Sequence, residues 1–143
     1  MKIYESTVTY NEVGSIDADR LDHPRLVAAY MKDAFIDNPL QEQVFVILLN
    51  RKNVPIARER VSLGSATSTI IEPSIVFRPA ILANATAVII CHNHPSGDPA
   101  PSQADLKVTS KIAKCGEILN ITIHDHLIIG DDSYYSFSDH GLL

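Results

Sequence analysis

Two histidines and an aspartate lie close together in the sequence, in the segment HNHPSGDPAPSQAD that runs from His92 to Asp105. In an extended backbone, residues two apart point to the same side and lie about 6.5 to 7 Å apart, so His92 and His94 can reach one ion while Asn93 points away. The loop 95–101 can fold Asp105 back toward both imidazoles. Two histidines and one carboxylate leave a fourth tetrahedral position for water, as in catalytic zinc sites. We therefore predict that His92, His94 and Asp105 bind Zn²⁺.

The chemistry expected of such a site is hydrolysis. Zinc lowers the pKa of a bound water toward about 7, and a nearby carboxylate can take the proton and pass it to the leaving group. Ser102 precedes Asp105 by three residues, so its hydroxyl can donate a hydrogen bond to the developing oxyanion. The same spacing is typical of a helix-capping box, which explains both residues by helix-end chemistry. The two interpretations do not exclude each other.

A second pair of histidines, His124 and His126, has the same spacing in the segment TIHDHL. No third ligand follows at a suitable distance, and the flanking residues are typical of a buried strand. We expect Asp125 and His126 to be structural, and a second metal site or an outer-shell role for Asp125 is the less favoured alternative. His23 and His140 belong to no metal-ligand pattern and are predicted to be exposed to solvent.

The elements that must position these residues are strands and helices in alternation. A short apolar strand from Thr86 to Cys91 leads directly into His92, and an amphipathic helix from Ser102 to Lys114 begins where the motif ends, with Gly116 as its stop.

Apolar periodicity predicts the remaining elements. Two more helices are expected, His23 to Phe35 and Pro73 to Ala85. The other expected strands are Lys2 to Val13, Glu42 to Leu49, Val54 to Leu63, Leu119 to Ile123, Leu127 to Ile129 and Tyr134 to Phe137, and a further strand can follow Gly64. Because strands alternate with helices and at least two hairpins are present, the sequence predicts an α/β fold with a single mixed sheet flanked by helices.

The length and composition of the chain indicate one ordinary globular domain. The chain has 143 residues, of which 45% are hydrophobic and 20% charged. We expect one domain over 1–143, with its core at about 26–143 and an N-terminal strand and linker at 1–25. The chain contains two cysteines, and because we expect no export signal, we expect both to be free, partly buried thiols.

The charge balance limits the expected partners. Twelve basic and seventeen acidic residues give a net charge of −5, so direct nucleic-acid binding is not favoured. The start MKIYESTVTY lacks the layout of a signal peptide, and no apolar run is long enough to span a membrane. We expect a cytoplasmic protein.

The segment HNHPSGDPAPSQAD, with DHLIIG downstream, closely resembles the C-terminal domain of RadC-like proteins in the JAB/MPN superfamily. The resemblance covers roughly Leu26 to the C-terminus. The metalloprotease signature of that superfamily is H-[ST]-H, seven residues, Ser, two residues and Asp, and its four positions match His92, His94, Ser102 and Asp105. Asn93 replaces the usual Ser or Thr, as it does in RadC-like proteins.

The resemblance implies a three-layer fold like that of cytidine deaminases, a zinc ion, and a peptide or isopeptide substrate. It also implies that the general base is a glutamate at the start of an early core strand, which places Glu42 of EQVFVILLN in that role. From the residues alone, Glu59 and Glu72 are rivals for it. The segment EPSIVFRPA differs from the P-R-E pattern common in relatives, with Ser74 and Ile75 in place of the charged pair.

Three functions compete. A zinc hydrolase of peptide or isopeptide bonds ranks first because the ligand set is complete. A DNA repair or nucleic-acid processing factor ranks second. We expect no helix-hairpin-helix region before the domain, and the HNH nuclease motif spreads its residues over a ββα unit whereas they are contiguous here. A catalytically idle interaction module ranks third. Zinc deaminases need a P-C-x-x-C ligand pair that this chain lacks.

Overall fold

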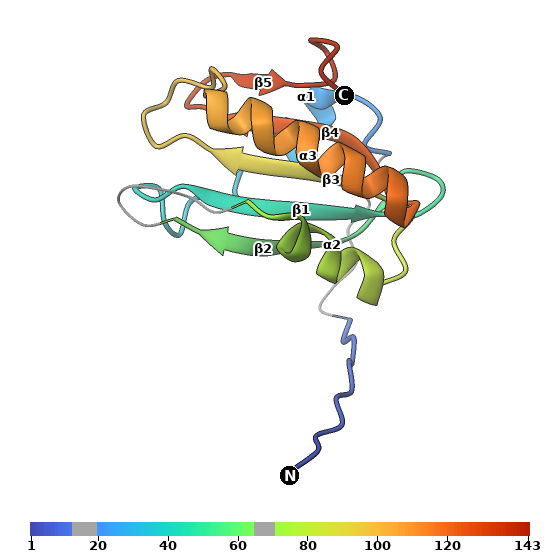
Figure 1. Ribbon diagram of the computed structural model, residues 1–143. Coiled ribbons are helices and arrows are strands. Elements are labelled where there is room, and N and C mark those ends of the chain that lie inside the picture. The colour runs from blue at the N-terminus through green and yellow to red at the C-terminus, as the bar shows by residue number, and fades with distance from the viewer. Residues whose placement is uncertain (13–19, 65–70) are drawn as a thin grey trace.

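Strands and helices alternate along the chain and form one mixed sheet with helices on both faces (Figure 1). The computed structural model describes residues 1–12, 20–64 and 71–143. The helices are α1 (Pro24–Tyr30), α2 (Pro73–Leu82) and α3 (Gln103–Leu119), and the strands are β1 (Gln43–Leu49), β2 (Pro55–Leu63), β3 (Ala87–Asn93), β4 (Thr122–Ile129) and β5 (Tyr134–Ser136).

The five-stranded sheet has the order β2-β1-β3-β4-β5. Strand β1 pairs antiparallel with β2 and β3, β3 pairs parallel with β4, and β4 pairs antiparallel with β5. Parallel strands need a crossover, and α3 supplies it between β3 and β4. The predicted α/β fold with a mixed sheet is therefore confirmed, and β1 forms a hairpin with β2, which lies at the edge of the sheet.

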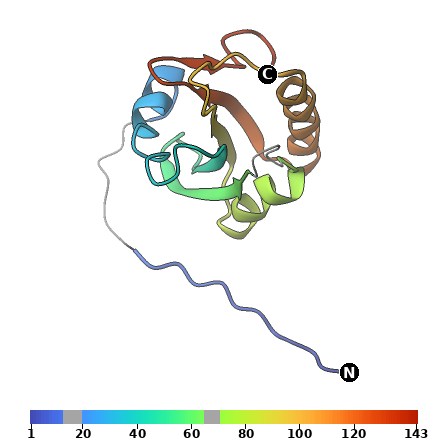
Figure 2. The ribbon, with the colours of Figure 1, turned by 90° about the vertical axis from the view of Figure 1, so that its left-hand side faces the viewer.

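The central strands of the sheet are buried on both faces, and helices cover both sides, which gives three layers (Figure 2). Every residue of β1 is buried, and alternate side chains enter different cores. Phe45, Ile47 and Leu49 pack in the cluster that includes α1, whereas Val44 and Val46 pack in the cluster that includes α2 and Ile112 of α3. The continuous apolar run from Val44 to Leu49 is the sequence signature of this double burial.

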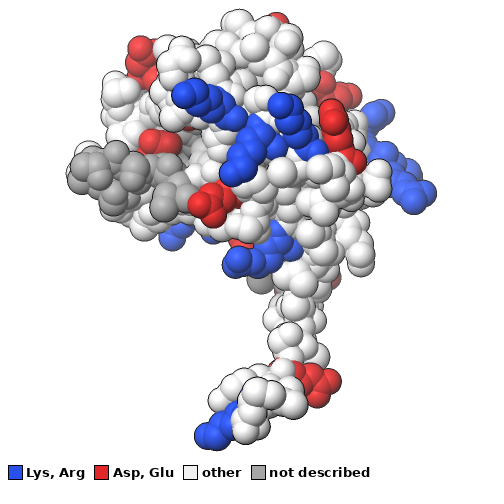
Figure 3. Space-filling model, in the orientation of Figure 1, with Lys and Arg blue, Asp and Glu red and all other residues white. Residues whose placement is uncertain are grey.

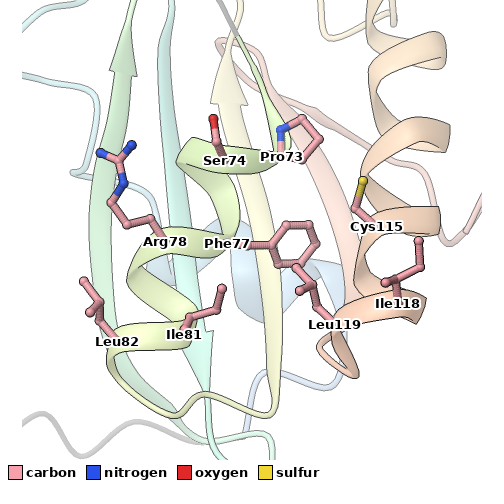
Figure 4. Close-up of a pocket in the computed structure, with 9 residues that line it drawn as sticks. All are labelled: Pro73, Ser74, Phe77, Arg78, Ile81, Leu82, Cys115, Ile118 and Leu119. Carbon is pink, nitrogen blue, oxygen red and sulfur yellow. The ribbon is translucent and has the colours of Figure 1, made fainter.

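An apolar groove of about 510 Å³ remains between α2 and α3. Figure 4 shows Phe77 of α2 pointing across it toward Leu119 of α3. Ile118 beside it is 81% exposed. None of the predicted site residues lines this groove.

The prediction of an N-terminal strand is wrong for residues 2–12. These residues are exposed, form no strand and extend away from the domain in Figures 1 and 2. Alternation of apolar and polar residues is not enough for a strand, because its backbone N–H and C=O groups need a neighbouring strand to pair with. Val13 and the stretch just after Gly64 lie outside the described residues.

Gly116 does not end its helix, contrary to the prediction. Helix α3 continues to Leu119, and the left-handed residue that follows is Asn120, with φ of 55° and ψ of 37°. Gly116 is buried, and a Cβ built on it would lie 2.5 Å from the backbone oxygen of Ile121. The glycine therefore permits the chain after the helix to pack closely against it.

The two strands expected at 119–123 and 127–129 are one strand, β4. The polar residues between them continue the pairing with β3, since Asp125 lies opposite Ile89 and His126 opposite Ile90. Both polar side chains are buried, and both form hydrogen bonds inside the protein. In the part of the chain that the structure describes, no helix has the length and apolar character needed to cross a membrane.

Candidate metal centre

Strand β3 and the first turn of α3 bring the three predicted ligands together. His92 lies near the end of β3, His94 follows the strand, and Asp105 is the third residue of α3. Each offers one ligand atom, and these atoms all lie within 4.8 Å of one another. Among the described residues, this is the group of histidine, cysteine and acidic side chains that can hold a metal ion.

The separations are close to those of a tetrahedral zinc site, with the two distances to Asp105 measured to different carboxylate oxygens. Bonds of 2.0 to 2.1 Å require neighbouring ligand atoms to be about 3.3 Å apart. The two Nε2 atoms of His92 and His94 lie 3.1 Å apart. The carboxylate of Asp105 lies 3.4 Å from Nε2 of His92 through Oδ1 and 3.6 Å from Nε2 of His94 through Oδ2. The donor atoms and their spacing therefore suit a divalent cation such as Zn²⁺.

The backbone fixes which nitrogen of His94 faces the centre. Nδ1 of His94 lies 2.8 Å from the carbonyl oxygen of Asp98. A carbonyl only accepts, so Nδ1 carries a proton, and in the neutral imidazole Nε2 presents its lone pair. The loop after β3 thus both reverses the chain toward Asp105 and orients a ligand.

Ser102 and Asp105 form the capping box that the sequence predicts. The backbone N–H groups of Ser102 and Asp105 each donate to the other residue's side chain. The Ser102 hydroxyl also donates to Oδ2 of Asp105 at 2.6 Å. Helix-end chemistry therefore orients the acidic ligand, and the predicted oxyanion role of Ser102 stays a prediction.

The electrostatics of the centre favour a negatively charged Asp105 and a neutral His92. Burial raises the pKa of Asp105, but the hydrogen bonds from His94 and Ser102 and the charge of His92 outweigh it and hold that pKa well below its usual range. The hydrogen bond to Asp105 raises the pKa of His94. Burial lowers the pKa of His92 to about 4, against the opposing charge of Asp105. His92 is thus a neutral imidazole at neutral pH, as metal binding requires.

Glu42 lies beside these ligands at the start of β1. Its Oε1 is 3.9 Å from Nε2 of His92, and its side chain is 29% exposed. The antiparallel pairing of β1 with β3 sets this proximity, because Val44 lies opposite His92. Of the rivals, Glu59 is on the exposed edge strand β2, whereas Glu72 precedes α2 and lines the same hollow as Glu42 and Asp105.

Two hollows border the centre. One, of about 360 Å³, is lined by residues that include Glu42, Asp105 and Lys111. The other, of about 220 Å³, is lined by residues that include Asn93 and His94. Asp105 lines the first hollow and His94 the second, so each hollow borders one of the candidate ligands.

His126 contacts the centre although its sequence pattern indicated only a structural role. It is fully buried, and its Nε2 lies 2.7 Å from Nδ1 of His92. The segment HDHL contains this histidine, but its contact with His92 depends on the parallel register of β4 against β3, which the sequence does not show. Asp125, whose outer-shell role was the alternative, instead accepts hydrogen bonds from the backbone of His126 and Ser138 and from the Ser136 hydroxyl.

The remaining histidines lie away from the centre. His124 contacts Oδ1 of Asn53 at 2.9 Å. His23 and His140 are exposed, as predicted. Cys91 and Cys115 are free thiols, the first buried and the second partly buried, which confirms the prediction.

Comparison with known proteins supports the resemblance seen in the motif. A protein-family model described as "RadC-like JAB domain" matches residues 21–142. A protein of Chlorobaculum parvum named "UPF0758 protein" is 44% identical over 117 residues, which are 82% of this chain and 52% of the relative. A UPF0758 protein of Clostridium kluyveri is 48% identical over 103 residues, 72% of this chain and 45% of the relative. The chain thus spans about half the length of these relatives.

Proposed function

Because the chain belongs to the family of RadC-like JAB domains, we propose that it is a zinc-dependent hydrolase of peptide or isopeptide bonds. The observation that carries the proposal is the convergence of two histidines and one aspartate at tetrahedral spacing with a glutamate beside them. When bound, a divalent cation polarises the scissile carbonyl and makes water a stronger acid. His92, His94 and Asp105 hold it.

Glu42 is the proposed general base. Its carboxylate is close enough to the ligands to contact a water molecule there, and its partial exposure leaves room for substrate. A carboxylate in this position takes a proton from the attacking water and returns it to the leaving amine. Ser102 is the proposed donor to the oxyanion, and for that step its hydroxyl turns away from Asp105, to which it donates here.

The two hollows support an extended substrate. A chain that crosses the centre places one side of its scissile bond near Lys111 and the other near Asn93 and His94. Peptides and lysine-linked isopeptides are extended enough to span both sides. The exposed ammonium of Lys111 favours an acidic side chain or a carboxylate on its side of the bond.

The test uses the purified protein loaded with Zn²⁺ and a library of tryptic peptides and lysine-linked isopeptides in H₂¹⁸O. Mass spectrometry then identifies products that carry ¹⁸O at a new carboxyl group. We expect cleavage by the wild type and a rate lower by about 100-fold or more in Glu42→Gln at unchanged zinc content. Glu59→Gln removes a rival carboxylate and is the matched control, expected to cleave like the wild type. A wild type that binds no metal, or an unimpaired Glu42→Gln, overturns the proposal.

One observation favours the second candidate, nucleic-acid processing. Lys and Arg side chains gather over α3 on the face seen in Figure 3, and Lys107, Lys111 and Lys114 of α3 are all exposed. The net charge of −5 opposes it. Filter binding with duplex and single-stranded DNA across a salt series tests it, since tight and salt-sensitive binding that is lost in a triple lysine-to-glutamine variant reverses the ranking.

A further inference from the structure

A chain of hydrogen bonds leads from one ligand of the centre to another through the protein interior. Nδ1 of His92 lies 2.7 Å from Nε2 of His126, and Nδ1 of His126 lies 2.6 Å from Oγ1 of Thr109. Oγ1 of Thr109 lies 2.7 Å from the backbone carbonyl oxygen of Asp105, one helical turn earlier. The chain thus begins at a histidine ligand and ends on the backbone of the aspartate ligand.

The direction of every bond follows from the last one. A carbonyl oxygen only accepts, so the single hydroxyl proton of Thr109 is donated to Asp105. Oγ1 of Thr109 must then accept the proton of Nδ1 of His126. Because a neutral imidazole has one N–H, Nε2 of His126 is bare and accepts from Nδ1 of His92.

We infer that Thr109 and His126 are positioning residues that hold His92 in the Nδ1–H tautomer and thereby aim its Nε2 lone pair at the metal centre. The role inferred for this tautomer rests on the proposed metal centre, but the tautomer itself can be observed in the metal-free protein. The opposite tautomer places a hydrogen on Nε2, between His92 and the other two ligands, and excludes a metal bond there.

The surroundings of His126 support the assignment. Its side chain and that of Thr109 are almost completely buried, so water does not compete for these hydrogen bonds. The ring of Phe137 stacks on the imidazole of His126 at 4.7 Å between centroids and 10° between planes, which fixes the ring plane. Complete burial disfavours a charged imidazolium, so His126 is neutral and has one proton to donate.

The two ligand histidines are thus oriented in different ways. His94 donates directly to a backbone carbonyl, whereas His92 donates to a second imidazole whose state depends on a hydroxyl. Removal of that hydroxyl leaves the Nδ1–H of His126 without its acceptor in a dry interior. The protons of His126 and His92 are then expected to move to other ring nitrogens, which changes both tautomers.

The matched variants are Thr109→Val, which keeps the shape and loses the hydroxyl, and Thr109→Ser, which keeps the hydroxyl. Affinity is measured with Zn²⁺ alone, by competition with a chromophoric chelator. Imidazole ¹⁵N shifts of the metal-free protein report which nitrogen of His92 and His126 is protonated. We expect Thr109→Val to lose about 10- to 100-fold in affinity for Zn²⁺ and to change the tautomers, whereas Thr109→Ser keeps both near the wild type. Ser110→Ala, an exposed neighbour on α3, controls for changes in the helix.

The two readouts separate this inference from the proposed function. If the wild type binds no Zn²⁺ but shows the Nδ1–H tautomer, which Thr109→Val disturbs, the proposed function fails and the orientation of His92 stands. If Thr109→Val folds with the tautomers of the wild type, the positioning role is wrong whatever the metal does. Should Thr109→Val fail to fold, the wild-type ¹⁵N shifts decide, since an Nε2–H tautomer in His92 contradicts the inference directly.

Discussion

The side-chain oxygen of Asn93 accepts a hydrogen bond from the backbone N–H of Gln43 at 2.6 Å. The side-chain nitrogen of Asn93 donates to the carbonyl of Gln41 at 3.2 Å, so one amide holds the residues on both sides of Glu42. Asn93 is 7% exposed and lies between the two ligand histidines. Asn93, which points away from the metal in the motif, therefore fixes the position of the proposed base, Glu42.

Asn93→Ala is expected to impair cleavage without removing the metal. It leaves the ligands in place but frees the segment around Glu42, and a displacement of about 1 Å can cost about 100-fold in rate. The buried N–H of Gln43 also loses its acceptor, which costs about 1 to 3 kcal/mol of stability. Zinc content and the rate in the ¹⁸O assay are measured together. Loss of zinc in this variant would show that Asn93 orients the ligands instead.

The sequence alone could group the three candidate ligands because they lie within one segment. His92, His94 and Asp105 follow one another along a strand, a loop and a helix start, and local spacing is enough to group them. The capping interaction of Ser102 with Asp105 is also local. Such predictions depend on backbone geometry over a few residues.

The contacts that depend on strand register could not be predicted in this way. Glu42 reaches His92 because Val44 pairs with that histidine, and His126 reaches it because β4 runs parallel to β3. A shift of one residue in either pairing would turn these side chains to the other face of the sheet. The resemblance to a known family supplied Glu42, and no local pattern supplied the link from His126 to Thr109.

Removal of the metal should lower the thermal stability. A ligand present at 100 times its dissociation constant stabilises the native state by about 2.7 kcal/mol. For a chain of this size that corresponds to about 5 to 10 °C in Tm. Thermal unfolding is compared with saturating Zn²⁺ and with a chelator, and His92→Ala should lose the difference. An equal shift in His92→Ala would mean that Zn²⁺ binds somewhere else.

The two thiols should differ in reactivity. Burial raises the pKa of Cys91, and the nearby charge of Asp125 raises it further. Because only the thiolate reacts, a raised pKa leaves fewer reactive molecules at any pH below it, and burial also blocks access. Iodoacetamide at pH 8 should label the native protein at Cys115 and reach Cys91 only after unfolding, as read by peptide mass spectrometry. Cys115→Ser is the control, and labelling of its native form would contradict the prediction.

Asp125 should stabilise the turn that follows β5. Its carboxylate accepts from the backbone N–H groups of His126 and Ser138 and from the Ser136 hydroxyl. Asp125→Ala leaves these donors without a partner and should cost about 2 to 4 kcal/mol in urea unfolding. Asp125→Asn keeps one oxygen acceptor and should cost distinctly less. Equal losses in the two variants would show that the carboxylate charge, and not hydrogen bonding, is what matters.

Gly116→Ala should destabilise the protein although alanine is the better helix former. In an exposed helix the exchange gains about 1 kcal/mol. Here the new Cβ would lie 2.5 Å from the backbone oxygen of Ile121, so either α3 or the start of β4 must move. Such overpacking typically costs about 1 to 3 kcal/mol. Urea unfolding measures the difference, and Ser110→Ala on the exposed face of α3 is the control, expected to change stability by less than about 0.5 kcal/mol. A more stable Gly116→Ala variant would mean that the contact with Ile121 relaxes freely and that the glycine has no packing role.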